Sequence, residues 1–179
     1  TLPTVICLAR RLSASKSEAL AAKGISVIST PDIRWGRCDI KTVMLLPATM
    51  AKQKAKESGA NDAWFVDEDG FVTEGGSANA WIVDREGRLI TRALDKSILP
   101  GITRSVLLDL LKRENLTLVE RPFTIEEAQA AREAVISSAT SLVMPVVAID
   151  GKPVGNGAPG LIAQQLRAQF HEAAERAPA

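Results

Sequence analysis

Tyrosine is absent from the 179-residue chain, and histidine occurs only once, at His171. A histidine-based catalytic triad or a multi-histidine metal centre is therefore hard to build here. The absence of tyrosine removes another common proton donor or acceptor. His171 lies in a C-terminal segment rich in alanine and charge, where a solvated helix face explains it more simply than catalysis does.

Cysteine, excess charge and long apolar runs are also scarce. Cys7 and Cys38 lie far apart without CxxC spacing, which indicates reduced thiols rather than a zinc site or a disulfide framework. The formal net charge is +1 and the basic residues are scattered, which argues against a nucleic-acid partner. No apolar run approaches the roughly 20 residues of a membrane-spanning helix, and residues 1–12 do not resemble a secretory signal. We therefore expect a cytoplasmic protein with no membrane association.

Length and composition fit one globular domain. Hydrophobic residues make up 46% of the chain, which is enough to build a buried core. No internal repeat or linker is evident, and only the last few residues look frayed. We place the domain at residues 1–175 and the frayed tail at residues 176–179.

Short apolar runs alternate with amphipathic segments along the chain. Strands are predicted at residues 4–9, 25–29, 63–66, 71–73, 80–83, 88–91, 116–120 and 134–136, and a strand, turn and strand at 145–152. Helices are predicted at residues 18–23, 45–58, 100–111, 125–128 and 161–176, the first capped by Ser15 or Ser17. The strands between residues 63 and 91 are expected to form an antiparallel meander, because short turns separate them.

A lysine and a glutamate stand in two unusual settings. Lys41 follows Cys-Asp-Ile in a segment broken by proline and glycine, and Glu74 ends a predicted strand just before two glycines. Taken singly, such a lysine is usually a surface residue and such a glutamate flanks a turn. Together they suggest a pyridoxal phosphate site, because this aldehyde needs an amine to hold it and an anion beside its ring nitrogen.

Two further segments are candidates for binding the phosphate. The helix that opens at residues 100–104 presents free amides and the hydroxyl of Thr103, although an ordinary capped helix is the simpler explanation of this segment taken alone. Residues 137–141 read Ser-Ser-Ala-Thr-Ser at a strand end. They form either a second phosphate contact or merely a turn.

Several spaced motifs follow one another in a fixed order: Arg34-Trp35-x-Arg37-Cys38-Asp39-Ile40-Lys41, Val72-Thr73-Glu74-Gly75 with Asn79, Ile98-Leu99-Pro100-Gly101-Ile102-Thr103-Arg104, Pro122-Phe123-Thr124, Ser138-Ala139-Thr140 and Ile149-Asp150-Gly151. Their order strongly resembles that of the class IV, or fold-type-IV, aminotransferases, and within them the D-amino-acid group. Several motifs in fixed order are far more specific than any one of them. The resemblance runs through nearly the whole chain.

This resemblance implies an α/β (α+β) fold with a curved mixed sheet that forms a pseudo-barrel flanked by helices. It identifies the chain as the second, C-terminal and cofactor-binding domain of such an enzyme, without the N-terminal domain of roughly 100 or more residues found in the family. It also implies a homodimer, with the site near the domain and subunit boundaries.

The family's functional residues map onto matching positions of this chain. Lys41 would form the Schiff base with pyridoxal 5′-phosphate and then, partly desolvated, move the proton, and Glu74 would pair with the ring nitrogen. The other implied contacts are Leu99 against the ring, Ile102 and Thr103 on the phosphate, Ser138, Ala139 and Thr140 as a second phosphate contact, Ser77 in the hydrogen-bond shell, and Arg34 and Arg37 as organisers of anions or ordinary salt bridges. Gly76 and Ala78 depart from the family by replacing serines often found there.

The resemblance implies transamination of D-amino acids, such as D-alanine with 2-oxoglutarate, so the expected partners are small amino acids and 2-oxo acids. The alternatives within the class are branched-chain aminotransferase, aminodeoxychorismate lyase and R-selective amine transaminase. The Arg-Cys-Asp-Ile-Lys string favours the D-amino-acid group. A non-catalytic fragment that keeps the fold without binding the cofactor is the alternative from another class.

Overall fold

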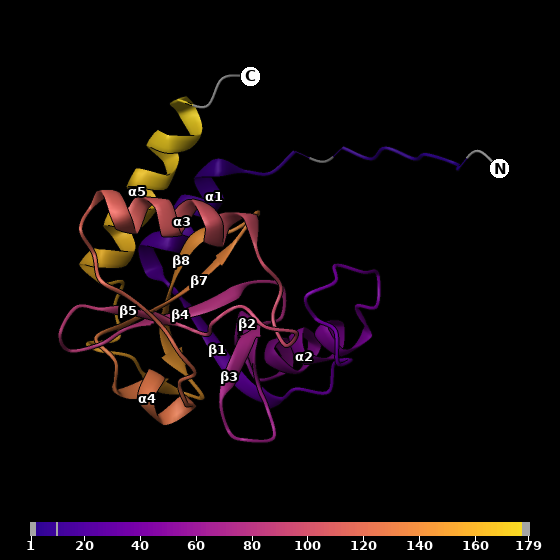
Figure 1. Cartoon of the computed structure of the whole chain (residues 1–179), viewed down its shortest axis with the longest axis horizontal. Helices are drawn as coiled ribbons and strands as arrows, with labels where there is room; N and C mark the ends of the chain where they lie inside the picture. Colours follow the sequence, from indigo (N-terminus) through magenta and orange to yellow (C-terminus); the bar gives the residue numbers. More distant parts are fainter. Residues whose placement is uncertain (1–2, 10, 177–179) are drawn as a thin grey trace.

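The computed structural model describes residues 3–9 and 11–176, which form a curved mixed sheet with helices around it (Figure 1). The strands are β1 Ile25–Pro31, β2 Asp62–Val66, β3 Val72–Gly75, β4 Asn79–Val83, β5 Leu89–Thr91, β6 Leu118–Glu120, β7 Glu133–Ser138, β8 Leu142–Ile149 and β9 Lys152–Pro153. The helices are α1 Ala14–Lys23, α2 Leu46–Glu57, α3 Ile102–Arg113, α4 Ile125–Ala130 and α5 Leu161–Arg176. Within these residues, no helix is both long and apolar enough to cross a membrane.

The sheet curls so that its two ends approach each other. Its order is β3-β2-β1-β8-β7-β4-β5-β6, with β9 paired to β8. Strand β1 is parallel to β2 and β8, and β5 is parallel to β6, whereas the other pairs are antiparallel. At the start of β3, the N–H of Val72 donates to the carbonyl of Phe123, beyond β6, at 2.9 Å. The predicted α/β pseudo-barrel is therefore confirmed.

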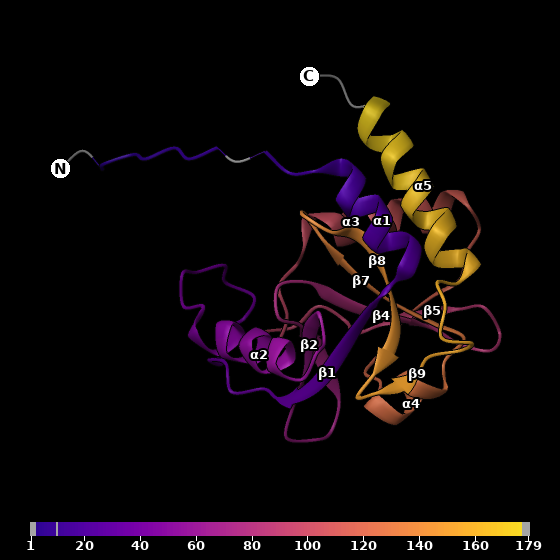
Figure 2. The same ribbon diagram turned by 180° about the vertical axis from the view of Figure 1, so that it is seen from behind.

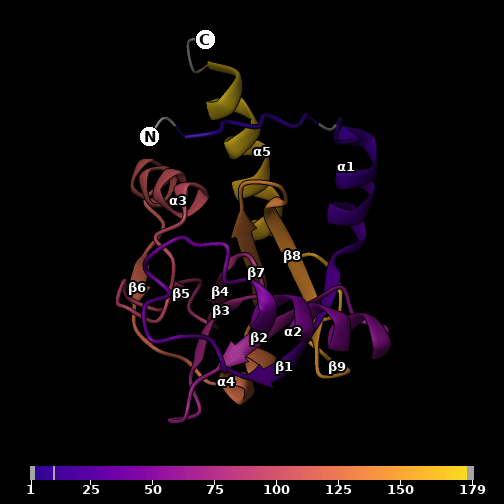
Figure 3. The same cartoon turned by 90° about the vertical axis from the view of Figure 1, so that its right-hand side faces the viewer.

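The helices are divided between different sides of the sheet. In Figure 3, α1, α3 and α5 lie together at one end of the molecule and α4 lies at the other, while α2 packs on β2 and β1. Arg167 of α5 joins three elements, because it donates to the carbonyl of Val143 in β8 at 2.7 Å and to Glu18 of α1, also at 2.7 Å. Its guanidinium is buried, so these bonds compensate for its desolvation.

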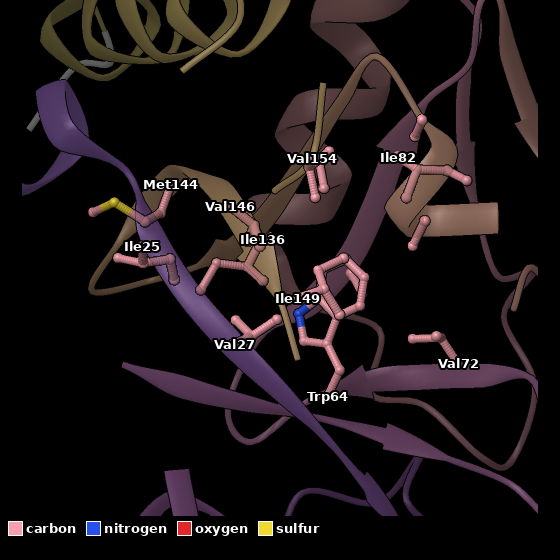
Figure 4. Close-up of a cluster of buried hydrophobic side chains, with 14 of the residues drawn as sticks. Ile25, Val27, Trp64, Val72, Ile82, Ile136, Met144, Val146, Ile149 and Val154 are labelled. Carbon is pink, nitrogen blue, oxygen red and sulfur yellow. The ribbon is translucent and has the colours of Figure 1, made fainter. Parts of the chain in front are cut away.

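Buried apolar side chains fill both faces of the curved sheet. Inside the curl, the cluster in Figure 4 includes Ile25, Val27, Trp64, Val72, Ile82, Ile136, Met144, Val146, Ile149 and Val154. The rings of Trp64 and Phe123 pack edge to face, with their centroids 6.0 Å apart. A second cluster, under α3 and α5, includes Trp81, Leu107, Leu111 and Leu166. The burial of these apolar side chains therefore stabilises the packing on both faces of the sheet.

Two local predictions near the amino terminus are wrong. Residues 3–9 form no strand, and Figure 2 shows this segment leading away from the sheet. A β-branched composition makes a strand only when another strand supplies the hydrogen bonds, and within the described chain this segment pairs with none. Helix α1 begins earlier than predicted, because Ser13 rather than Ser15 or Ser17 caps it by accepting from the N–H of Lys16 at 3.3 Å.

The antiparallel meander predicted for residues 63–91 is also wrong. The segment forms two hairpins, β2 with β3 and β4 with β5, but β3 and β4 are not neighbours in the sheet. Instead, β3 lies at one end of the sheet order and β4 pairs with β7. An alternating pattern identifies a strand but not the distant strand with which it pairs. The predicted helices at residues 45–58, 125–128 and 161–176 are confirmed as α2, α4 and α5.

A buried carboxylate caps the last helix. Glu133 of β7 accepts from the N–H of Ile162 at 3.1 Å and from that of Ala163 at 2.8 Å. Gly160 makes this approach possible, because a Cβ at that position would lie only 1.9 Å from Cδ of Glu133. The carboxylate therefore satisfies two amides that the first turn of α5 leaves without helical partners.

We expect Glu133→Ala to lower the free energy of unfolding by about 1–3 kcal/mol, because one buried and one partly buried amide lose their acceptor. Urea denaturation followed by circular dichroism measures this change. Glu68→Ala, in the exposed turn before β3, is the control and is expected to shift stability by less than about 0.5 kcal/mol. Equal denaturation midpoints for the two variants would contradict the capping role of Glu133.

Candidate active site

Four segments that are distant in sequence line one cavity of about 520 Å³. They are the loop between β1 and α2, the turn between β3 and β4, the segment that leads into α3, and the turn between β7 and β8. Of the residues predicted for the site, Arg34, Lys41, Glu74, Ser77, Leu99, Ile102, Thr103, Ser138 and Ala139 line this cavity. Lys41 and Glu74 thus face the same space, as the sequence-based hypothesis required.

Lys41 lies in the irregular loop between β1 and α2, where proline and glycine were expected to break regular structure. Its side chain is exposed. The partial desolvation expected of this amine is therefore not supplied by the described residues. Cys38 and Trp35 of the same loop also line the cavity, and burial raises the pKa of the Cys38 thiol above its ordinary value.

Glu74, at the end of β3, is the buried acidic group of the cavity, with 6% of its surface exposed. Its Oε1 pairs with Nη1 of Arg34. Its Oε2 accepts from Nδ2 of Asn79 and from the N–H of Leu99, each at 3.1 Å. Burial raises the pKa of Glu74 above its ordinary value, and the charge and hydrogen bond of Arg34 oppose that rise.

Arg34 is itself held by a second carboxylate. Its Nε donates to Oδ1 of Asp32 at 2.8 Å, and its Nη2 donates to Oδ2 at 2.7 Å. Its guanidinium carbon lies 4.6 Å from the centre of the Phe65 ring. Burial opposes the charge on Arg34, but its hydrogen bonds to Asp32 and the charges of Glu74 and Asp32 raise its pKa above the ordinary value. Arg34 therefore stays protonated between the two acids.

The two arginines of the first motif differ in their surroundings. Arg34 bridges Asp32 and Glu74, so its salt bridges and its contact with the cavity belong to one arrangement. Arg37 pairs with Asp39 at 2.8 Å, and its side chain is 55% exposed. Arg37 is not among the residues that line the cavity. Of the two roles left open for Arg37, the ordinary salt bridge is the one its contacts fit.

The side of the cavity predicted to bind phosphate combines a helix start with a turn. The first residue before α3 is Gly101, which provides no side-chain cap, so the amides of the first turn remain available. Thr103 and Ser138 contribute hydroxyl groups to the lining. Thr140 is exposed and is not among the lining residues, in contrast to its predicted contact. The N–H of Ser141 donates to Oγ of Ser138 at 3.1 Å and closes this turn.

Sequence reasoning missed some residues that shape the site. Asp32 holds Arg34, and its only sequence signal is its position two residues earlier at the exit of β1. Asn79 was part of a motif, but its bond to Glu74 was not predicted. Lys52 of α2, which no motif singled out, donates to Oγ of Ser77 at 2.6 Å. His171 lies outside the cavity lining, with Nε2 3.2 Å from Oε1 of Glu18.

The comparison with known families bears directly on this arrangement. The family model described as amino-transferase class IV matches residues 2–149, which include all four segments that line the cavity. The chain belongs to the class IV aminotransferases. The resemblance inferred from the motifs is thereby confirmed, and four of the six motifs of this class IV aminotransferase chain contribute residues to the cavity wall.

Curated relatives support the same assignment. The chain is 40% identical over 152 residues to the D-alanine aminotransferase of Bacillus licheniformis, and the match covers 85% of this chain and 53% of that protein. It is 38% identical over 162 residues to the D-alanine aminotransferase of Listeria monocytogenes, and that match covers 90% of this chain and 55% of that protein. This class IV aminotransferase chain therefore spans about half the length of the curated relatives it matches.

Solved structures of related class IV enzymes have the same fold. The branched-chain amino acid aminotransferase from Thermobaculum terrenum, in its pyridoxal phosphate form, aligns with a TM-score of 0.80 at 27% identity, over 91% of this chain and 54% of that one. The branched-chain aminotransferase from the thermophilic archaeon Thermoproteus uzoniensis, with norvaline, aligns with a TM-score of 0.72 at 27% identity, over 84% of this chain and 51% of that one.

The Arg34–Glu74 pair generates a prediction about stability and pH. Arg34→Met removes the charge that opposes the raised pKa of buried Glu74, and the unpaired Asp32 shifts in the same direction. A carboxyl group whose pKa is raised in the folded state makes its full contribution to the free energy of unfolding at low pH. This contribution is lost as the pH rises through the folded-state pKa. We therefore expect the unfolding free energy of Arg34→Met to fall more steeply than that of the wild type from about pH 4.5 upwards.

Denaturation at a series of pH values from about 4.5 to about 8 measures this slope. Arg37→Met is the matched control, because it removes an arginine of the same loop whose side chain is exposed. We expect its slope to follow the wild type. A slope for Arg34→Met that equals that of Arg37→Met would show that Arg34 does not hold Glu74 in its ionised form.

Proposed function

We propose that the complete protein catalyses pyridoxal 5′-phosphate-dependent transamination of D-amino acids, with D-alanine as a donor and 2-oxoglutarate as an acceptor. The observation that carries this proposal is one cavity lined by both Lys41 and the buried Glu74. The identity of 38–40% to D-alanine aminotransferases supports the donor class. The activity is assigned to the whole protein, in which residues 1–175 would serve as the cofactor-binding domain.

The groups that line the cavity fit this cofactor. The open amides at the start of α3, with the hydroxyl of Thr103, suit a phosphate, and Ser138 and Ala139 lie in the neighbouring turn. The carboxylate of Glu74 suits a protonated ring nitrogen, and the amine of Lys41 suits an aldehyde. The volume of about 520 Å³ lies in the range of small-molecule pockets. Leu99 and Ile102 add apolar surface to the wall.

When bound, the cofactor supplies an aromatic ring that accepts the electrons left when an amino acid loses its α-proton. Lys41 would hold the cofactor through its amine and, once released, carry that proton. The charge of Arg34 favours the ionised form of Glu74, which is the form that would accept a hydrogen bond from a protonated ring nitrogen. Leu99 would pack against the ring and keep water from that face.

The surroundings of the cavity favour a homodimer. Apolar side chains of the loop before α2 are exposed, among them Ile40 at 43%, Val43 at 94%, Met44 at 60% and Leu45 at 58%. Exposed apolar side chains gathered in one short segment are typical of an interface with another part of a protein or with a partner. We propose that a second subunit and the remainder of the protein cover this loop and shield the exposed Lys41. The cytoplasmic location expected from the sequence is retained as part of the proposal.

Branched-chain aminotransferase activity is the second candidate. It is supported by the fold shared with the branched-chain enzymes, with a TM-score of 0.80 for the Thermobaculum terrenum structure. The identity to that structure is 27%, whereas the identity to the D-alanine enzymes reaches 40%. Because pocket side chains set substrate preference, the higher identity makes D-amino acids the preferred substrate class.

A visible spectrum tests the cofactor assignment. The full-length protein with added pyridoxal 5′-phosphate is expected to show a protein-bound absorbance band that free cofactor lacks. Lys41→Ala should lose this band, because the amine that holds the cofactor is gone. Lys56→Ala, on the exposed side of α2, is the control and should keep it. Retention of the band in Lys41→Ala would disprove the role of Lys41.

A chiral assay tests the substrate class. Incubation with D-alanine and 2-oxoglutarate should yield D-glutamate and pyruvate, and Lys41→Ala should lower the rate by about 10²–10⁴-fold or more. L-leucine with 2-oxoglutarate is the matched reaction for the branched-chain candidate. Formation of L-glutamate from L-leucine, without D-glutamate from D-alanine, would favour the second candidate over the first.

A further inference from the structure

Lys52 of α2 reaches the wall of the cavity from outside. Its Nζ lies 2.6 Å from Oγ of Ser77, which lines the cavity in the turn between β3 and β4. The same Nζ lies 4.0 Å from Oδ1 of Asp62, and the Lys52 side chain is 43% exposed. Lys52 is not itself among the lining residues. Its ammonium group therefore acts on the cavity through Ser77.

Gly76 opens the path by which Lys52 reaches Ser77. A Cβ at residue 76 would lie 2.8 Å from Cε of Lys52, 3.2 Å from its Cγ, and 2.8 Å from Oδ1 of Asp62. Contacts this short would force the lysine side chain to move. The replacement of a serine often found at this position in the family thus has a physical consequence: it admits a cation beside the next residue.

The chemistry of the two groups fixes the direction of their hydrogen bond. An ammonium group has donors and no acceptor, so Oγ of Ser77 must accept from Lys52. The hydroxyl hydrogen of Ser77 is then free to donate elsewhere. Within residues 3–9 and 11–176, Oγ of Ser77 has no other hydrogen-bond partner. Because Ser77 lines the cavity, this hydrogen can be donated to a molecule bound there.

We propose that Lys52 is a positioning residue that fixes the Ser77 hydroxyl as a hydrogen-bond donor to an anionic oxygen of the molecule bound in the cavity. This inference rests on the proposed function, and it adds a determinant of binding that lies outside the cavity wall. The acceptor belongs either to the cofactor or to the carboxylate of the substrate. Both sources share the same chemistry, because a negatively charged oxygen strengthens a hydrogen bond from a polarised hydroxyl.

The test uses the full-length protein and the variant Lys52→Met, which keeps an unbranched chain and removes the ammonium group. Lys54→Met removes a charge from the same exposed helix and is the matched control. One readout is the dissociation constant of pyridoxal 5′-phosphate from the apoprotein, followed by quenching of tryptophan fluorescence, to which Trp35 at the cavity contributes. The other is KM and kcat for D-alanine at saturating cofactor.

Lys52→Met is expected to raise one of these constants roughly five- to tenfold, the loss typical of one hydrogen bond. A higher dissociation constant for the cofactor places the acceptor on the cofactor. A higher KM for D-alanine, with unchanged kcat and cofactor affinity, places it on the substrate carboxylate. Lys54→Met should leave both constants within about twofold of the wild type, since its charge lies away from the cavity wall. If Lys52→Met behaves like Lys54→Met in both readouts, the inference is overturned.

A double-mutant cycle shows whether Lys52 acts through Ser77. Ser77→Ala should cause at least the loss seen in Lys52→Met, and the combined variant should lose no more than Ser77→Ala alone. Gly76→Ala, which displaces the lysine, should resemble Lys52→Met. Additive losses from Lys52 and Ser77 would overturn the inference. A wild-type protein that binds no cofactor would instead overturn the proposed function, and this inference with it.

Discussion

The site depends on a buried ion pair, in which the charge of Arg34 opposes the effect of burial on the carboxylate of Glu74. Glu74 is almost fully buried at the cavity, and desolvation alone would favour its neutral form. The guanidinium of Arg34 opposes this effect, and Asp32 fixes the guanidinium from the other side. The three charges link the exit of β1 to the end of β3. A buried carboxylate can accept a hydrogen bond from a positively charged ligand atom and stabilise its charge. A neutral carboxyl group would not stabilise that charge.

The curvature of the sheet brings these groups together. Strands β1, β2 and β3 are neighbours at one end of the sheet, while β7, with its following turn, reaches the cavity from beyond β8. The contact between Val72 and Phe123 holds the ends of the curl near each other. Leu99 and Gly101 line the cavity and come just before α3, so this helix begins at the cavity wall. The fold thus places an anion site and a carboxylate on walls built from distant segments.

Much of this arrangement was predictable from local pattern. The amphipathic segments predicted α3 at residues 100–111, and they predicted α2, α4 and α5 close to their observed bounds. The motif order predicted that Lys41 and Glu74 share a cavity. The sequence pattern gave wrong predictions where a strand depends on a pairing strand that is distant in sequence. The strand at residues 4–9 lacked a pairing strand, and β4 joined β7 rather than β3.

The same limit explains what was missed within the site. Asp32 and Lys52 read as ordinary charged residues, because their roles depend on Arg34 and Ser77, which only folding brings close. The absence of a side chain at Gly76 was visible in the sequence, but the lysine that uses the space was not. The exposure of the Lys41 side chain was not predicted from the sequence. It agrees with the resemblance, which implies a site to which parts of the protein outside this chain also contribute.

The most direct test of the central claim is a crystal structure of the full-length protein with bound pyridoxal 5′-phosphate. The account predicts that the ring nitrogen lies about 2.6–3.2 Å from a carboxylate oxygen of Glu74 while Arg34 keeps its pair with that residue. Lys41 should then lie at the aldehyde end of the ring. A ring nitrogen that faces solvent or another side chain, with Glu74 bonded only to its present partners, would contradict the account.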